Sequence, residues 1–329
     1  MRGKSKWEKG QKNTFEKPEG SGVFIISLIA VVAVAMFSNY LYIPALPLIA
    51  RDLSVSNGAV VITVTATLIG TGISQLFYGS ISDSYGRKKT LIVGIVIVCI
   101  GTIFVIISSS ISQLIIARFV MGLGLGSASV LYRVMLKDYF PPSSLGWAVS
   151  TVTTFTALLP AVSPFIGGMI LIAVSWRILF VILLIYSIII IFFVLKYLPE
   201  THKKEDRIPF TGKLILNNYL SLFNIKGYFI YVLCIIFSYA CLILYITSSP
   251  FIYQNVFHLS PAVYGALIVI PTLAFVVGGK FSASMNKKDI KLSKLISCGF
   301  YIIIISCIFL TFSNFLCIDN YIMTTNKDR

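Results

Sequence analysis

The stretch GSISDSYGRKKTL, residues 79–91, lies between two long apolar runs of the chain. It places one acidic residue, three consecutive basic residues and two glycines in a short hydrophilic gap. Elsewhere the sequence avoids charge: of its 329 residues 12% are charged and 57% are hydrophobic, which is far more apolar than a soluble domain. We therefore interpret the gap as a polar connection between two membrane-spanning segments.

Apolar runs of about 20 residues, the length that a helix needs to cross a bilayer of about 30 Å, recur along the chain. Backbone polar groups in hydrocarbon must be hydrogen-bonded within their own segment, so such runs form helices. The runs lack the polar alternation of transmembrane strands. The sequence thus predicts an all-α polytopic membrane protein with nine spans, near residues 23–50, 59–79, 91–109, 112–136, 146–174, 177–197, 228–251, 262–279 and 295–317.

The net charge of +15 is concentrated on one side of the predicted membrane. Most of the 27 lysines and arginines lie before the first span or in alternate loops, which places the N-terminus and those loops in the cytoplasm by the positive-inside rule. This distribution argues against a nucleic-acid partner and identifies the lipid bilayer as the surroundings of the chain. The cysteines and histidines show no metal-ligand spacing, and no Ser/His/Asp arrangement is present, so we predict neither a metal site nor an enzyme.

A long polar interruption, PETHKKEDRIPFTGKLILNNYLSLFNIK, separates six predicted spans from three. A loop after the second of those three spans, GGKFSASMNKKD at residues 278–289, weakly repeats the opening stretch and suggests two like-oriented halves. We predict five parts: a basic cytoplasmic N-terminal segment at 1–22, a six-helix transmembrane half at 23–198, a cytoplasmic linker at 199–226, an incomplete C-terminal transmembrane half at 227–317 and a tail at 318–329.

Four motifs carry a family resemblance. The stretch GSISDSYGRK, residues 79–88, resembles the loop motif of the major facilitator superfamily, between spans two and three. LIIARFVMGLG, residues 114–124, is similar to that family's span-four motif, and PAVSPFIGG, residues 160–168, to the span-five motif of its antiporter branch. YIPALP at 42–47, together with SWR at 175–177, resembles the bicyclomycin-resistance (Bcr/CflA-type) drug exporters within that family. The resemblance covers roughly residues 23–316 and implies the major facilitator fold.

The opening loop has a physical interpretation of its own. Gly86 can adopt the positive φ that ends one helix and turns the chain, and Asp83 can accept charge-assisted hydrogen bonds from Arg87. The plain alternative is an ordinary turn with a cytoplasmic cation cluster. The resemblance implies a gating latch that grips the other half near span eleven, made of Gly79, Asp83, Gly86, Arg87 and Lys88.

Arg118 lies inside the fourth predicted span, where a cation costs about 3 kcal/mol on insertion scales and usually faces a cavity. The resemblance implies a role in proton coupling or substrate orientation. The alternative is a structural arginine that snorkels outward or bonds backbone carbonyls. On the same helix, Gly122 and Gly126 form a GxxxG pattern that favours close packing of a neighbouring helix.

The fifth predicted span contains Pro160 and Pro164, each of which removes a helix hydrogen bond, followed by Gly167 and Gly168. We expect a kink there. The resemblance implies that this kink is the antiporter motif, which governs leakiness and alternating access.

The resemblance also implies the function: efflux of drugs or other amphipathic small molecules from the cytoplasm, by proton-coupled alternating access, across the bacterial cytoplasmic (inner) membrane. The proton gradient would supply the energy without any cofactor, and the oligomeric state is open. We expect the substrate cavity to be lined by Met36, Asn39, Tyr40, Phe155 and Tyr239.

Two features depart from the family pattern. Bcr/CflA-type exporters carry an aspartate at the position of Tyr40, and no acidic residue lies within a predicted span, so the usual proton carrier is missing. A tyrosine hydroxyl keeps its proton at physiological pH and is a poor substitute. The family has twelve spans, whereas only nine are predicted here, and we expect a chain truncated at its C-terminus. The alternative function is therefore that of a truncated, non-transporting membrane fragment.

Overall fold

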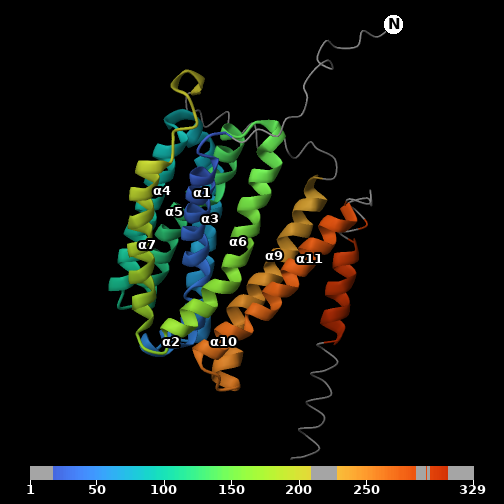
Figure 1. The fold of residues 1–329 in the computed structure, drawn as a ribbon. Helices are drawn as coiled ribbons and strands as arrows, with labels where there is room; N and C mark the ends of the chain where they lie inside the picture. Colours follow the sequence, from blue (N-terminus) through green and yellow to red (C-terminus); the bar gives the residue numbers. More distant parts are fainter. Residues whose placement is uncertain (1–17, 209–227, 287–293, 295–296, 310–329) are drawn as a thin grey trace, which may run out of the picture. The chain divides into compact units, whose positions relative to one another are not determined.

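A computed structural model describes residues 18–208, 228–286, 294 and 297–309 (Figure 1). The regular structure of these residues is helical throughout. Within this part of the chain, eight helices are long and apolar enough to cross a membrane, which confirms the predicted polytopic all-α architecture. Of the ninth predicted span, the described portion is the shorter apolar helix Ser297–Phe309, and residues 310–317 lie outside the described residues.

The first six spans match the predicted runs. The first of them consists of α1 (Ser21–Tyr40), a 3-10 turn η1 (Ile43–Ala45) and α2 (Leu46–Asp52), and the break coincides with the YIPALP stretch. The other five are α3 (Asn57–Tyr85), α4 (Arg87–Ile107), α5 (Ile111–Tyr139), α6 (Pro142–Ile170) and α7 (Trp176–Tyr197). A short turn η2 (Lys204–Asp206) follows, and then come α9 (Tyr228–Phe251), a π-helical turn η3 (Ile252–Val256), α10 (Pro261–Leu267) and α11 (Val269–Asn286).

Serine and glycine set the helix boundaries. The side chains of Ser56, Ser110 and Ser260 each accept a hydrogen bond from a backbone N–H in the first turn of α3, α5 and α10, so they satisfy donors that a helix start leaves unpaired. Gly86 ends α3 and begins α4 with φ of 100°, the positive value predicted for it.

Helix α5 is the centre of the N-terminal half, packed most extensively against α3 and α4 (Figure 1). Glycines permit this packing. A Cβ on Gly122 would overlap the carbonyl oxygen of Thr67 in α3, and a Cβ on Gly124 would lie 2.6 Å from the backbone nitrogen of Val98 in α4. The predicted close approach of a neighbouring helix to the glycines of α5 is therefore present.

The chain divides into two compact units, residues 1–272 and 273–329, so α9 and α10 group with the first six helices. The domain limits predicted from the sequence remain a prediction. Several of the segments that they name lie outside the described residues, namely 1–17, residues 209–226 of the linker and the whole tail at 318–329.

The glycine contacts lead to a stability prediction. Gly122→Ala should destabilise the protein by about 1–3 kcal/mol, because the added methyl group forces α3 and α5 apart. Gly72→Ala is the matched control, since a Cβ at Gly72 in α3 meets nothing within 4 Å and alanine improves helix propensity. Thermal unfolding of the purified protein in detergent measures both. Equal melting temperatures for the two variants would contradict this account of the packing.

Candidate functional site

The loop between α3 and α4 is organised by Arg87, whose side chain is 7% exposed. Its Nη1 forms an ion pair with Asp83 one turn earlier and donates to Ser82 Oγ at 2.6 Å. Its Nε donates to Asp138 Oδ2 on α5 at 3.1 Å. The predicted Asp83–Arg87 pairing is thus present. We call Ser82, Asp83, Arg87 and Asp138 the Arg87 cluster, and it joins the ends of three helices.

A carboxylate from far along the chain completes this loop. Glu200, just after α7, accepts hydrogen bonds from the backbone N–H groups of Arg87 at 2.9 Å and Lys88 at 3.3 Å. These are unpaired donors of the first turn of α4, where the helix dipole also favours a negative charge. Gly86 leaves room for the contact, because a Cβ there would come within 2.6 Å of Glu200 Oε2.

The segment that follows Glu200 lies along the same loop. Ser84 Oγ donates to the carbonyl of Ile208 at 2.6 Å, and the Ile208 N–H donates to the carbonyl of Asp83 at 3.3 Å. A ring nitrogen of His202 lies 3.1 Å from the Asp83 carbonyl oxygen, and Lys88 Nζ donates to the Leu195 carbonyl at 2.8 Å. The predicted latch loop is therefore bound by the segment that directly follows its own half.

Sequence analysis did not select Asp138 or Glu200 as site residues. A signal in the sequence could have identified both. Each is an acidic residue just after a predicted span, at the end predicted to lie on the same side of the membrane as the basic stretch at 87–89. Gly79, the remaining latch residue, lies within α3, and a Cβ there would meet nothing within 4 Å.

Arg118 is buried, with 1% of its surface exposed, among α1, α5 and α7. Its Nη1 donates to the carbonyl of Ser38 at 3.0 Å. The guanidinium carbon lies 4.0 Å from the ring centre of Tyr42 and 5.7 Å from that of Phe180. Within the described part of the chain, Nε and Nη2 of Arg118 and the hydroxyl of Tyr42 have no hydrogen-bond partner.

This arrangement differs from a snorkelling arginine, because the guanidinium points into the helix core. A carbonyl dipole and two aromatic faces stabilise the cation, and no carboxylate of the described residues forms an ion pair with it. Tyr42 belongs to the YIPALP stretch, so two of the four sequence motifs meet at this one contact.

The antiporter motif forms the contact between α6 and α10. Helix α6 runs unbroken through Pro160 and Pro164, and the predicted kink stays a prediction. A Cβ on Gly168 would overlap the carbonyl of Pro261, and one on Gly265 of α10 would lie 2.5 Å from the carbonyl of Pro164. The two glycines therefore permit reciprocal close approach of the helices. Gly167 lies against the carbonyl of Leu41 in the same way.

Helices α2 and α10 lie together at one end of the helix bundle (Figure 1), and polar contacts join the chain segments beside them. Gln254 of η3, which is 7% exposed, donates from Nε2 to the carbonyl of Pro44 at 2.8 Å, and Arg51 Nη2 donates to Asn255 Oδ1 at 3.0 Å. We call these two contacts, together with the glycine contacts of α6 and α10, the outer seal, a name that follows the orientation predicted from the basic loops. Nearby, Asp52 pairs with Arg177 at 2.6 Å.

The predicted cavity residues are only partly brought together. Tyr40 of α1 and Tyr239 of α9 are close enough to interact electrostatically. Tyr239 and Phe155 are 47% and 55% exposed. Met36 and Asn39 are half-buried in α1, where Asn39 Nδ2 donates to the carbonyl of Ala35 at 2.9 Å. None of the five lines the groove described below, which sequence analysis did not anticipate.

The family assignment agrees with this geometry. Residues 28–324 match the sequence model of the Major Facilitator Superfamily. The chain belongs to the major facilitator superfamily.

Curated relatives support the assignment of this major facilitator protein. It is 31% identical to the uncharacterized MFS-type transporter YdgK of Bacillus subtilis over 81% of this chain and 67% of the relative. It is 31% identical to multidrug resistance protein D of Escherichia coli over 80% of this chain and 66% of the relative. The bicyclomycin resistance protein homolog of Haemophilus influenzae is 28% identical over 84% of this chain and 67% of the relative. The chain thus spans about two thirds of the length of these relatives.

Solved structures support the fold. The xylose transporter XylE of E. coli superposes with a TM-score of 0.61 at 15% identity, over 81% of this chain and 73% of that one. The human organic anion transporter MFSD10 superposes with a TM-score of 0.56 at 14% identity, over 78% and 70% of the two chains. The interpretation of the chain as a multi-pass membrane protein of the major facilitator superfamily is confirmed.

The Arg87 cluster leads to a second stability prediction. Arg87→Met should destabilise the protein by about 1–3 kcal/mol, because it leaves Asp83 and Asp138 in mutual repulsion without their shared cation. Lys137→Met, a change of one exposed cation beside Asp138, should have little effect. Melting temperatures in detergent compare the two variants. A double variant, Arg87→Met with Asp138→Asn, should recover part of the loss, and its failure to do so would contradict the proposed pairing.

Proposed function

We propose that this chain exports drugs or other amphipathic small molecules from the cytoplasm of a bacterium by alternating access. Its sequence relatives include proteins named for multidrug resistance and for bicyclomycin resistance, which support this substrate class. Because the chain spans about two thirds of those relatives, the transport activity itself is part of the proposal.

The observation that carries the proposal is the asymmetry of α9. Its buried residues, Thr247, Ser249 and Pro250, all lie in its last turns, next to the outer seal. Nearer its start, Tyr231 and Tyr239 are about half exposed, at 46% and 47%. Alternating access requires a barrier at one end of the membrane and an open route at the other, and this arrangement suits a state closed on the outer side.

The outer seal is also suited to reversible opening. It consists of glycine contacts, one buried hydrogen bond from Gln254 and one exposed hydrogen bond from Arg51, and the buried Tyr264 of α10 adds an apolar contact beside them. A displacement of η3 would break both hydrogen bonds without unwinding a helix, and this supports opening at this end of the structure.

Arg118 contacts the chain segment next to the outer seal. It bonds the carbonyl of Ser38 and packs on Tyr42, and Pro44, two residues further on, accepts the hydrogen bond of Gln254. A displacement of η3 would therefore shift the segment between α1 and α2, and the guanidinium group of Arg118 contacts this segment through Tyr42. We infer that Arg118 helps to couple substrate or proton occupancy to opening, and that its effect passes through Tyr42.

The substrate would contact aromatic faces in the open region. Phe155, Tyr40 and Tyr239 come from α6, α1 and α9, and they offer the amphipathic surface that drug-like molecules prefer. The proposal includes the proton gradient as the energy source and the cytoplasmic position of the basic loops. In the described helices, Asp52, Asp83 and Asp138 all lie within the last three residues of a helix, so a carboxylate in mid-membrane is not part of the proposed coupling.

Dye export from energised cells tests the function. We expect a bacterium lacking its own exporters to lose preloaded ethidium when it expresses this chain, and to stop doing so after an uncoupler is added. Arg118→Lys retains the charge but loses the planar contact with Tyr42, and it should slow export by about tenfold. Absence of export from a chain present in the membrane, across several dyes, would contradict the proposal and favour a membrane protein without export activity.

A reversible cross-link tests alternating access separately. With cysteines at Arg51 and Asn255, a reducible bifunctional thiol reagent should hold the outer seal closed and lower export to background, because the two side chains meet across the seal. A reducing agent should restore export, and each single cysteine variant should be insensitive. Undiminished export after complete cross-linking would show that the seal does not open during transport.

A further inference from the structure

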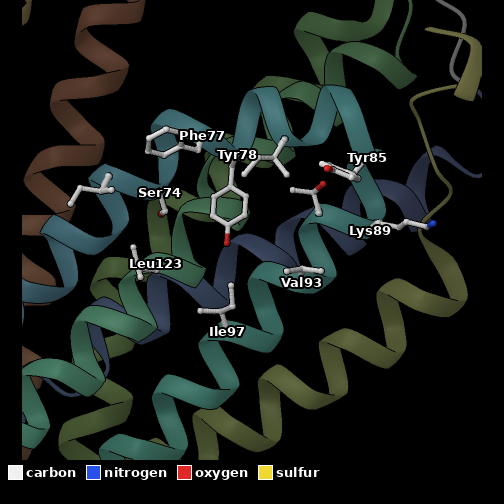
Figure 2. Close-up of a pocket in the computed structure, with 11 residues that line it drawn as sticks. Ser74, Phe77, Tyr78, Tyr85, Lys89, Val93, Ile97 and Leu123 are labelled. Carbon is white, nitrogen blue, oxygen red and sulfur yellow. The ribbon is translucent and has the colours of Figure 1, made fainter. Parts of the chain in front are cut away.

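An apolar groove of about 590 Å³ lies between α3 and α4 and is separate from the outer seal and the predicted substrate residues (Figure 2). Phe77 of α3, Val93 and Ile97 of α4 and Leu123 of α5 contribute to its lining. Its volume falls within the range of about 300–1,000 Å³ that is usual for ligand pockets. Phe77 and Val93 are 43% and 57% exposed, so the groove opens on a surface of the helices and is not closed inside them.

Polar side chains line this apolar groove at different depths. Lys89 and Tyr85 belong to the stretch at 79–91 and lie at one end of the groove, and the ring of Tyr78 lies midway along it (Figure 2). Tyr78 is 7% exposed, and its hydroxyl has no hydrogen-bond partner among the described residues. An unpaired hydroxyl in such a place favours a ligand that carries an acceptor.

The positive charge of Lys89 has no acidic partner among the described residues. The acids nearest in the loop are already engaged: Asp83 and Asp138 bind Arg87, and the carboxylate of Glu200 binds backbone N–H groups of α4. The ammonium group of exposed Lys89 forms no hydrogen bond or ion pair within the described ranges. The groove therefore combines an uncompensated cation at the membrane surface with an apolar path into the bilayer.

We propose that this groove binds one anionic phospholipid from the adjacent leaflet. The phosphate contacts Lys89, an acyl chain follows Phe77, Val93 and Ile97, and the hydroxyl of Tyr78 donates to an ester carbonyl. Tyr78 precedes Tyr85 by seven residues, or about 10 Å along a helix, which places its hydroxyl below the level of the headgroup. A basic residue beside the membrane attracts anionic lipid, whereas a neutral headgroup gains nothing from it.

A further helix is the competing occupant, and the walls of the groove argue against it. Where α5 packs on α3 and α4, the helices meet at glycines such as Gly122 and Gly124. The groove presents bulky side chains instead, among them Phe77 and Tyr85. An acyl chain adapts to such a surface more readily than a second helix does.

Lipid competition on the purified full-length chain tests the charge. Native mass spectrometry should show phosphatidylglycerol bound about fivefold more tightly than phosphatidylcholine with the same acyl chains. Lys89→Gln should abolish this preference, whereas Lys137→Gln, which removes an exposed lysine on the same membrane side but away from the groove, should retain it. Equal binding of the two lipids to the unmodified chain, or loss of the preference in both variants, would overturn the proposal.

The groove itself is tested by filling it. Val93→Trp should weaken binding of both lipids, and Val96→Trp, on an exposed part of α4 that does not line the groove, should not. A photoreactive phenylalanine analogue at Phe77, activated in native membranes, identifies the neighbour by the mass of its adduct. A phospholipid adduct supports the proposal. A peptide adduct, from this protein or from a second copy, overturns it, and neither result depends on whether the chain transports.

Discussion

Close contact between helix backbones at glycine is the interaction on which this structure depends. In a bilayer, helices gain little from burying apolar side chains against one another, since lipid is equally apolar, so van der Waals contact of near backbones must hold them together. Gly122 and Gly124 bring α5 against α3 and α4 in the core of the N-terminal half, and Gly168 and Gly265 bring α6 against α10. The same device therefore builds both the rigid core and the outer seal.

Charged groups are arranged around this framework according to their access to water. The Arg87 cluster and the Asp52–Arg177 pair lie at opposite ends of the helices, where partly exposed carboxylates keep some hydration. Arg118 is the exception. Its cation is buried about two turns into α5, without a carboxylate partner among the described residues. Its stabilisation by Ser38 and the ring of Tyr42 requires an accurate position of α1. A buried charge held by such weak partners makes the break after α1 sensitive to small shifts of the helices around it.

The two membrane ends differ in how they are held. At the loop end, Glu200 binds the start of α4 and the segment up to Ile208 follows the same loop, so the six-helix half is fastened by its own terminal segment. At the other end, Gln254 and Asn255 of η3 bind Pro44 and Arg51, so the later part of the chain joins the first span there. One end is thus stabilised by contacts with the segment that directly follows the six-helix half, and the other by contacts across the linker.

Much of the fold could be read from the sequence, because apolar run length, basic loops and the glycine at residue 86 act locally. The ion pair of Asp83 and Arg87 was predictable for the same reason, since residues four apart share a helix face or turn. The contacts of Arg87 with Asp138, of α4 with Glu200 and of Pro44 with Gln254 were not predictable, because they join residues 51, 113 and 210 positions apart. The groove beside Tyr78 and Lys89 likewise depends on the divergence of α3 and α4 over α5. The sequence by itself determined the helices and their family, because apolar run length and local motifs act within short stretches. Only the tertiary structure decided which helices are neighbours, and therefore which distant polar groups meet, because that choice depends on how the whole helix set packs.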